Sequence, residues 1–232
     1  MIRVGTSGHN YPEWRGHFYP EKLPAKDMLG FYAERFSTVE INYTFYRTPT
    51  DTLLAGWAAT TPDDFVFTLK APRRITHDRR LRDVDEPLRA FCDAATALRA
   101  KLGPLFFQLP PNFKKDTDRL SDLLAMLPPG ARCAFEFRHA SWFADDVYLL
   151  LRSRDAALCI ADTEDGTTPD VATASWGYLR LRDAAYSDQE MDGWVDTITR
   201  HGWPDAYVYL KHEETASGPA LAQRLMTRLP PR

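Results

Sequence analysis

Residues 103–139 read GPLFFQLPPNFKKDTDRLSDLLAMLPPGARCAFEFRH and contain two strand patterns on either side of a helix pattern. Gly103–Pro110 and Arg132–His139 are short, rich in aromatic residues and bounded by Gly or Pro, as strands are. Between them, Asp116–Met126 repeats apolar residues at helical spacing. Two parallel strands need such a crossover helix, so this stretch predicts one unit of an α/β fold.

The same alternation extends over the whole chain. Six further strand patterns are Ile2–Ser7, Thr38–Thr44, Phe65–Lys70, Ala157–Thr163, Trp176–Arg182 and Asp205–Glu213. Six further helical patterns are Ala25–Phe36, Asp51–Thr60, Glu86–Lys101, Ser141–Arg152, Asp188–Thr199 and Pro219–Leu229. Thr50 and Ser141 are the expected N-caps of two of these helices. Eight parallel strands are the number that closes into a barrel, so we predict a single α/β domain over residues 1–232, a TIM-type (β/α)8 barrel.

One crossover departs from this pattern. Only about twelve residues separate the sixth strand from the seventh, and Gly166, Pro169 and Asp170 make them a loop, so we expect an irregular crossover without a helix there. An open doubly wound sheet is the alternative fold. That fold carries a Gly-rich phosphate loop after its first strand, and Ser7-Gly8-His9-Asn10 is not such a loop.

Composition limits the class of protein. Hydrophobic residues at 44% and charged residues at 26% are typical of a soluble globular domain. The longest apolar run, Ala156–Ala161, is far shorter than the roughly 20 residues of a membrane-spanning helix. Met1–Gly5 starts directly in a strand pattern without a signal peptide, so we expect a cytoplasmic protein. Cys92, Cys133 and Cys159 are too few and scattered for a disulfide framework, and we expect buried thiols.

Strand periodicity predicts which side chains line the barrel. Alternate residues of a strand point to opposite faces, so Val39 and Ile41 oppose Glu40 and Asn42. The apolar set suits the helix layer, which leaves the polar set for the interior near the C-terminal rim, where barrel enzymes place their active sites. The predicted rim set is Ser7, Glu40, Asn42, Lys70, Gln108, Glu136, Arg138, Asp162, Arg180, Arg182 and Lys211.

The rim set has five cations against three anions, which suggests a small anionic ligand with a phosphate or carboxylate group. In an enzyme, Glu136 would be the general acid or base, and Asp162 or Glu40 its partner. Lys70 or Arg180 would stabilise negative charge, or Lys70 would form a Schiff base. The structural alternative is an internal lattice of ion pairs that joins Glu40 or Glu136 to Arg138 or Arg180.

Loop residues add further predicted ligand contacts. Arg73 begins a basic stretch that ends at Arg82, and His139 and Trp142 follow the fifth strand. The basic stretch contrasts with the net charge of −3 of the whole chain. Together with aromatic residues in the loops, it supports a second hypothesis, that the protein is a nucleic-acid-binding or endonuclease-like barrel. A third reading is a ligand-binding protein without catalysis. The sequence does not set the oligomeric state.

Cofactor motifs are absent from the sequence. No P-loop, HExxH spacing or dinucleotide fingerprint occurs, so no organic cofactor is assigned and the cofactor is unknown. A divalent metal would need several carboxylate and histidine ligands to converge. The candidates near the rim are Glu40, Glu136, Asp162, His139, His212 and Glu213, and we assign none of them to a metal.

Several blocks together resemble a known family. Gly5-Thr6-Ser7-Gly8, Thr38-Val39-Glu40-Ile41-Asn42, Gln108-Leu109-Pro110-Pro111, Glu136-Phe137-Arg138-His139 and Lys211-His212-Glu213 are similar to the YecE-like family, domain of unknown function 72. The resemblance covers nearly the whole chain and implies a TIM-type barrel, sometimes grouped with sugar-isomerase-like and apurinic endonuclease barrels. It implies no reaction, because the family has no established one. Some members carry a histidine on the seventh strand where this chain has Arg182, so no role of that histidine is carried over.

Overall fold

The computed structural model describes residues 1–163, 166–183, 185–211 and 216–230. Within them, eight parallel strands form a closed barrel, because β5 pairs with both β4 and β6. The strands are β1 Ile2–Ser7, β2 Thr38–Ile41, β3 Val66–Lys70, β4 Leu102–Gln108, β5 Cys133–Glu136, β6 Ala157–Thr163, β8 Gly177–Leu181 and β9 Ala206–Leu210. The predicted TIM-type barrel is confirmed, and the alternative of an open doubly wound sheet is wrong.

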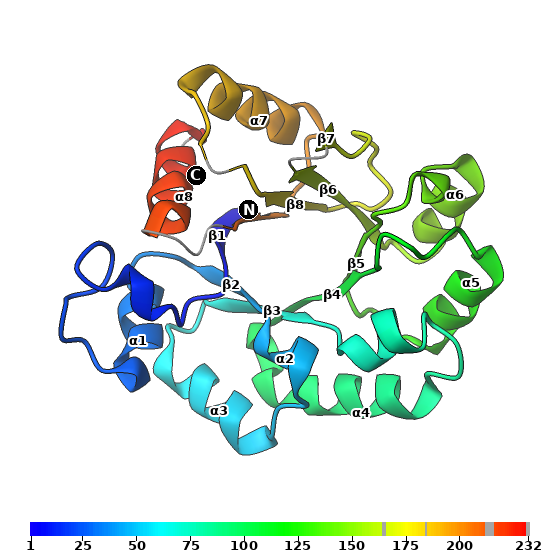
Figure 1. Ribbon diagram of the computed structural model, residues 1–232, viewed down its shortest axis with the longest axis horizontal. Coiled ribbons are helices and arrows are strands. Elements are labelled where there is room, and N and C mark those ends of the chain that lie inside the picture. The colour runs from blue at the N-terminus through cyan, green and yellow to red at the C-terminus, as the bar shows by residue number, and fades with distance from the viewer. Residues whose placement is uncertain (164–165, 184, 212–215, 231–232) are drawn as a thin grey trace.

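A ring of helices surrounds the strands (Figure 1). They are α1 Met28–Ala33, α2 Tyr43–Tyr46, α3 Asp51–Thr60, α4 Asp85–Ala95, α5 Thr117–Met126, α6 Asp145–Arg152, α7 Asp188–Arg200 and α8 Ser217–Arg228. Thr50 caps α3 as predicted, since its Oγ1 accepts the Leu53 N–H. The Ser141 prediction is wrong, because Ser141 lies in a separate 3-10 turn and Ala144 precedes α6. No helix in the described ranges is long and apolar enough to span a membrane.

The described part of the crossover between β6 and β8 contains no helix, as the sequence predicted. A short strand, β7 Gly166–Thr167, pairs antiparallel with β6, and the loop after it lies between α6 and α7 in Figure 1. Thr173 anchors this loop to β6, because its Oγ1 accepts the Leu158 N–H at 2.7 Å and donates to the Ala156 carbonyl at 2.7 Å. Side-chain hydrogen bonds therefore hold this segment against the barrel where a helix would otherwise pack.

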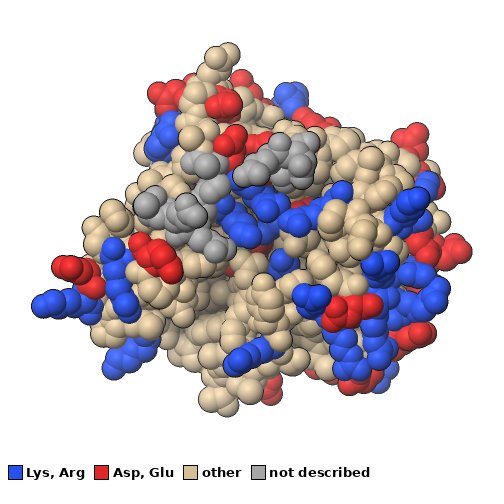
Figure 2. Space-filling view, in the orientation of Figure 1, with Lys and Arg blue, Asp and Glu red and all other residues tan. Residues whose placement is uncertain are grey.

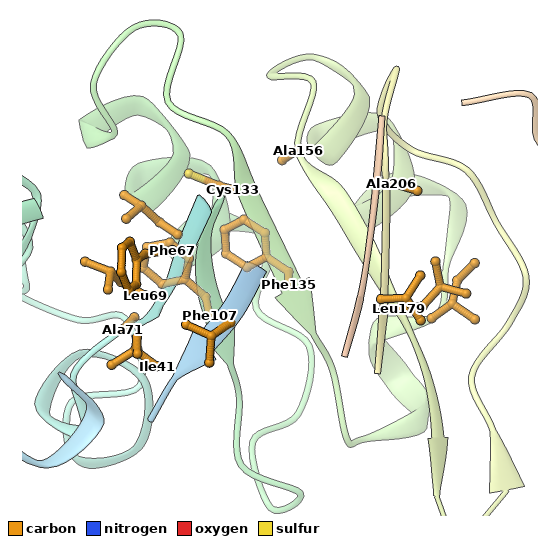
Figure 3. Close-up of a cluster of buried hydrophobic side chains, with 14 of the residues drawn as sticks. Ile41, Phe67, Leu69, Ala71, Phe107, Cys133, Phe135, Ala156, Leu179 and Ala206 are labelled. Carbon is orange, nitrogen blue, oxygen red and sulfur yellow. The ribbon is translucent and has the colours of Figure 1, made fainter. Parts of the chain in front are cut away.

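Strand alternation separates two apolar layers. The outer layer lies between strands and helices, and Figure 3 shows Phe67, Phe107 and Phe135 gathered within it. The inner layer includes Phe106 and Tyr178, whose rings stack with centroids 5.1 Å apart. Val39 and Ile41, which were predicted to face the helices, do so. The apolar residues that alternate with the polar rim residues on β4, β5, β8 and β9 lie in the same outer layer. The three cysteines are buried free thiols, as predicted.

Candidate functional site

Arg180, on β8, lies inside the barrel with 1% of its surface exposed. Its Nε and Nη2 donate to the two carboxylate oxygens of Glu40 at 3.0 and 2.9 Å, which is a bidentate pair. Its Nη1 donates to Glu136 Oε2 at 2.5 Å. Glu40 and Glu136 are themselves fully buried, at 0% exposure. One guanidinium therefore joins two buried carboxylates, which matches the internal lattice that the sequence left as an alternative.

Neighbouring strands complete the environment of Glu40. Ser7 is paired with Glu40 in the β1–β2 register, and its Oγ donates to Glu40 Oε1 at 2.5 Å. The same Oγ accepts a hydrogen bond from Asn42 Nδ2 at 2.9 Å. The Tyr178 hydroxyl donates to Glu40 Oε2 at 2.5 Å. Burial and the adjacent Glu40 charge raise the pKa of Tyr178, so this hydroxyl remains a donor at neutral pH.

A second line of hydrogen bonds leads from Glu136 to Lys70. Gln108 Nε2 donates to Glu136 Oε1 at 2.7 Å, and Lys70 Nζ donates to Gln108 Oε1 at 2.9 Å. Arg138 Nε also donates to Glu136 Oε1, at 2.9 Å. Burial alone would raise the pKa of Glu136, but the guanidiniums of Arg180 and Arg138 outweigh it and hold the pKa well below its ordinary value. Glu136 therefore stays ionised at neutral pH and is poorly suited to be a general acid.

Lys70 ends β3, and its amine lies in the barrel mouth. Its Nζ lies 4.3 Å from the ring centroid of Phe45. Burial, with repulsion from Arg180 and Lys211, lowers the pKa of Lys70 to about 7, although the two buried glutamates act in the opposite sense. A large share of the Lys70 amine is therefore neutral at physiological pH, and a neutral amine accepts protons.

A cleft of about 650 Å³ opens beside Lys70. Its lining includes the polar side chains of Asn42, Lys70 and Lys211 and the aromatic side chains of Tyr43 and Trp57. We call this space, defined by those five residues, the lysine cleft. It gives a small molecule access to the Lys70 amine.

A smaller hollow of about 390 Å³ lies at the β5, β6 and β8 side of the mouth. Its charged lining is Glu136, Arg138 and Arg182, and Thr167 and Thr168 also contribute. We call it the arginine hollow, defined by those five residues. In Figure 2, Lys and Arg atoms gather near the centre of the face shown. Among the described residues, the buried Nε of Arg182 has no hydrogen-bond partner.

Two predicted ligand contacts lie away from both spaces. Trp142 is buried in the outer layer, where it stacks on Phe137 at 4.7 Å and its Nε1 donates to the Phe113 carbonyl. His139 Nδ1 is hydrogen-bonded to Ser141, 2.9 Å from its Oγ. Neither residue lines the lysine cleft or the arginine hollow. Both side chains instead shape the turn after β5.

Asp162 was expected to face inward, and this placement is wrong. Cys159 and Ala161 belong to the inner layer, so strand alternation turns Asp162 to the outside. Its carboxylate accepts hydrogen bonds from the Tyr186 hydroxyl at 2.7 Å and the Thr167 hydroxyl at 3.1 Å. Asp162 is therefore not available as the partner of Glu136.

The basic stretch after β3 is exposed and partly neutralised. Arg73 Nε lies 3.0 Å from Asp78 Oδ1, and Arg74 Nη2 lies 3.6 Å from Glu86 Oε2. Both pairs are open to solvent, so each is worth little to stability. Arg73 lines neither the lysine cleft nor the arginine hollow.

Two contributions to the site had no role assigned from the sequence. Tyr178 could have been found, because it alternates in phase with Arg180 on one strand. Thr168, in the arginine hollow, comes from a short segment whose placement depends on tertiary packing, and no local sequence signal marks it. Phe45, against the Lys70 amine, is one of the loop aromatic residues that the sequence offered as ligand contacts.

Metal ligands do not gather within the described ranges, where no three His, Cys, Asp or Glu side chains form a group suited to a cation. Glu40 and Glu136 are engaged by Arg180. Two other candidates, His212 and Glu213, lie outside the described residues. The expectation that none of these residues is assigned to a metal therefore stays a prediction.

A closed α/β barrel with a charged mouth defines the class as a TIM-type barrel protein. The chain belongs to the family described as "Protein of unknown function DUF72", which matches residues 3–232 and confirms the resemblance. It is 31% identical over 145 residues to the UPF0759 protein YecE of Escherichia coli strain K12. The matched segment covers 62% of this chain and 51% of that protein. The chain spans about half the length of the curated relatives it matches.

Solved structures show the same fold. A crystal structure of a DUF72 family protein from Thermotoga maritima has a TM-score of 0.86 and 26% identity, covering 98% of each chain. The D-psicose 3-epimerase of Clostridium cellulolyticum H10, solved with D-tagatose, has a TM-score of 0.58 and 12% identity, covering 94% of this chain and 89% of that one. At that identity the likeness to the epimerase concerns the fold alone.

Proposed function

We propose that this protein is an enzyme that binds a small anionic ligand at the barrel mouth and transfers a proton on it with Lys70. The observation that carries the proposal is the buried Lys70 amine, whose pKa lies at about 7 beside an open cleft. An ordinary lysine is protonated at neutral pH and cannot act as a base. A pKa near the ambient pH is the value at which general acid–base catalysis is most effective.

The network assigns roles different from those expected from the sequence. Glu136, the expected general base, is occupied by three donors and acts as a positioning residue that holds Gln108, which in turn holds Lys70 Nζ. Glu40 pairs with Arg180 and has the same supporting role. The Lys70 amine remains as the group that can reach a ligand in the lysine cleft.

A neutral amine beside cationic side chains suits one class of reaction, proton transfer at a carbon next to a carbonyl. Lys70 would accept a proton from a carbon next to a ligand carbonyl, and the ammonium so formed would return the proton to carbon, with no net gain or loss of atoms. Lys211 and Asn42 line the same cleft and would stabilise the negative oxygen of the intermediate. Such chemistry suits a phosphorylated, sugar-like or carboxylate ligand. The sugar epimerase with the same fold adds no support beyond the fold.

The first test measures the Lys70 amine directly. Competitive labelling with acetic anhydride across pH 5 to 10, read by peptide mass spectrometry, should give a midpoint of about 7 for Lys70, with the other lysines as internal standards. A midpoint near the ordinary lysine value of about 10.4 would overturn the proposal.

The second test looks for proton transfer. Sugar phosphates and keto acids are incubated with the protein in D2O, and NMR measures deuterium incorporation next to the carbonyl. We expect incorporation with at least one compound, reduced about 100-fold in Lys70→Met, a size typical of a lost general base. The matched control is Lys22→Met, because Lys22 is exposed and outside both cavities. Binding without exchange would favour a ligand-binding protein that is not an enzyme.

The nucleic-acid hypothesis has one feature in its favour, the exposed arginines of the stretch that begins at Arg73. Ion pairs with Asp78 and Glu86 neutralise two of these charges, which weakens the reading. It predicts oligonucleotide binding that fades as salt rises. A cytoplasmic location likewise stays a prediction.

A further inference from the structure

We propose that the arginine hollow is a subsite for an oxyanion, a phosphate or a carboxylate, at the end of the ligand remote from Lys70. This inference rests on the proposed function, whose ligand occupies the lysine cleft. It deepens that function by naming the substrate class as a carbonyl compound that bears an oxyanion a few bonds from its carbonyl.

The hydrogen-bond donors of the hollow come mainly from Arg138 and Arg182, which line it. The Arg182 Nε is buried and unpaired within the described part of the chain. A buried donor without an acceptor has a large desolvation cost, so the Arg182 side chain would gain by turning its Nε toward a bound oxyanion. Arg138 uses Nε on Glu136, and its two terminal nitrogens make no hydrogen bond within the described ranges. Two guanidiniums thus line one hollow, an arrangement suited to carboxylate or phosphate.

The charges of the residues that line the arginine hollow also favour an anion. Glu136 is the one carboxylate that lines the hollow among the described residues, and Arg180, Arg138 and Gln108 already bind both of its oxygens. Burial is the main cause that lowers the pKa of Arg182, and repulsion from Arg180 and Arg138 adds to it against the pull of Glu136. Among the described residues the lining of the hollow is therefore short of negative charge, and a bound oxyanion would supply it.

The neighbouring hydroxyls do not compete for this role. The Thr167 hydroxyl donates to Asp162, and the Thr168 hydroxyl donates to the Cys159 carbonyl at 3.3 Å. Their protons are already engaged, so the arginines carry the affinity for an anion.

Hydrogen bonds connect the hollow to Lys70. Three hydrogen bonds in series link the Lys70 amine to Arg138 of the hollow. They run from Lys70 to Gln108, from Gln108 to Glu136 and from Arg138 to Glu136. The proposed ligand would lie across this row of side chains, with its oxyanion on the arginines of the hollow and its carbonyl near the amine in the lysine cleft. The Lys70 amine would act at the carbonyl end of the ligand, and the two arginines would bind its negatively charged end.

The test is calorimetric titration with inorganic phosphate and, separately, with acetate, at constant ionic strength. We expect the wild type to bind at least one of them and Arg182→Met to bind it at least tenfold more weakly. Arg182→Lys, which keeps the charge, should recover part of the affinity, and Arg74→Met, an exposed arginine paired with Glu86, should bind as the wild type does. Phosphate binding alone would identify a phosphorylated ligand, and acetate binding alone a carboxylate.

The inference is overturned if neither ion binds to the wild type, or if Arg182→Met binds as well as the wild type does. Circular dichroism of each variant checks that the barrel has folded, and Arg182→Lys replaces Arg182→Met if the latter has not. Acetic anhydride labelling of the same variants separates this inference from the proposed function. A Lys70 midpoint of about 7 without ion binding would remove the subsite alone, whereas Arg182-dependent ion binding with an ordinary Lys70 would remove the proposed catalysis alone.

Discussion

Charged residues of the barrel mouth lie at two depths, and the two groups differ in how their charge is balanced. In the inner group, the Arg180 guanidinium is matched by the buried carboxylates of Glu40 and Glu136. In the outer group, Lys70 donates to the neutral amide of Gln108, and the Arg182 Nε has no partner within the described residues. The inner group satisfies itself and supports the barrel. The outer group has no carboxylate bound to it among the described residues, and the proposed ligand site rests on this difference.

The largest expected effect comes from breaking the inner group. Arg180→Met leaves Glu40 and Glu136 buried without their shared cation, so we expect a loss of about 3–5 kcal/mol in the free energy of unfolding, measured in urea. Arg74→Met removes an exposed pair and should change it by less than about 1 kcal/mol. Equal effects of the two variants would mean that the inner group is not structural.

The outer group should make the free energy of unfolding depend on pH. The pKa of Lys70 falls from 10.5 to about 7 on folding, so in that window the unfolded chain holds more protons at Lys70, and the contribution of Lys70 to stability rises with pH across it. Relative to Lys70→Met, the wild type should gain about 3 kcal/mol between pH 7 and 9.5. Unfolding in urea at several pH values measures this difference. A constant difference between the two proteins would contradict the shifted pKa.

A smaller effect is expected where the two groups meet. The Ser7 hydroxyl links Glu40 and Arg180 of the inner group to Asn42 of the lysine cleft. Ser7→Ala should therefore cost about 1–2 kcal/mol of unfolding free energy, as expected for a buried hydroxyl with several partners. Ser153→Ala, at an exposed helix end, is the control and should have almost no effect. Comparable losses would show that Ser7 does not couple the two groups.

The smallest effect should have the opposite sign. Arg182→Met removes a partly buried cation that is short of counter-charge, so the free energy of unfolding should stay constant or rise by up to about 1 kcal/mol. Thermal and urea unfolding without added anion measure it. A loss above about 2 kcal/mol would place Arg182 in the structural group and contradict the comparison.

The sequence determined the fold and most of the inner lining. Strand and helix periods are local, and a closed barrel turns alternate residues inward, so Glu40, Glu136 and Arg180 could be placed in the interior from the sequence alone. The same alternation put Asp162 on the wrong face, because the phase of that strand cannot be read from a mostly apolar run such as Ala157–Ala161.

Only the tertiary structure decided what those side chains do. Arg180 and Glu40 are 140 residues apart, and their pairing depends on how distant strands close the barrel. The lowered pKa of Lys70 and the separation of the lysine cleft from the arginine hollow depend on burial and on charges from other strands. Desolvation and Coulomb energies are set by distances in space, so residue type predicted a charged mouth but not which charges remain available to a ligand.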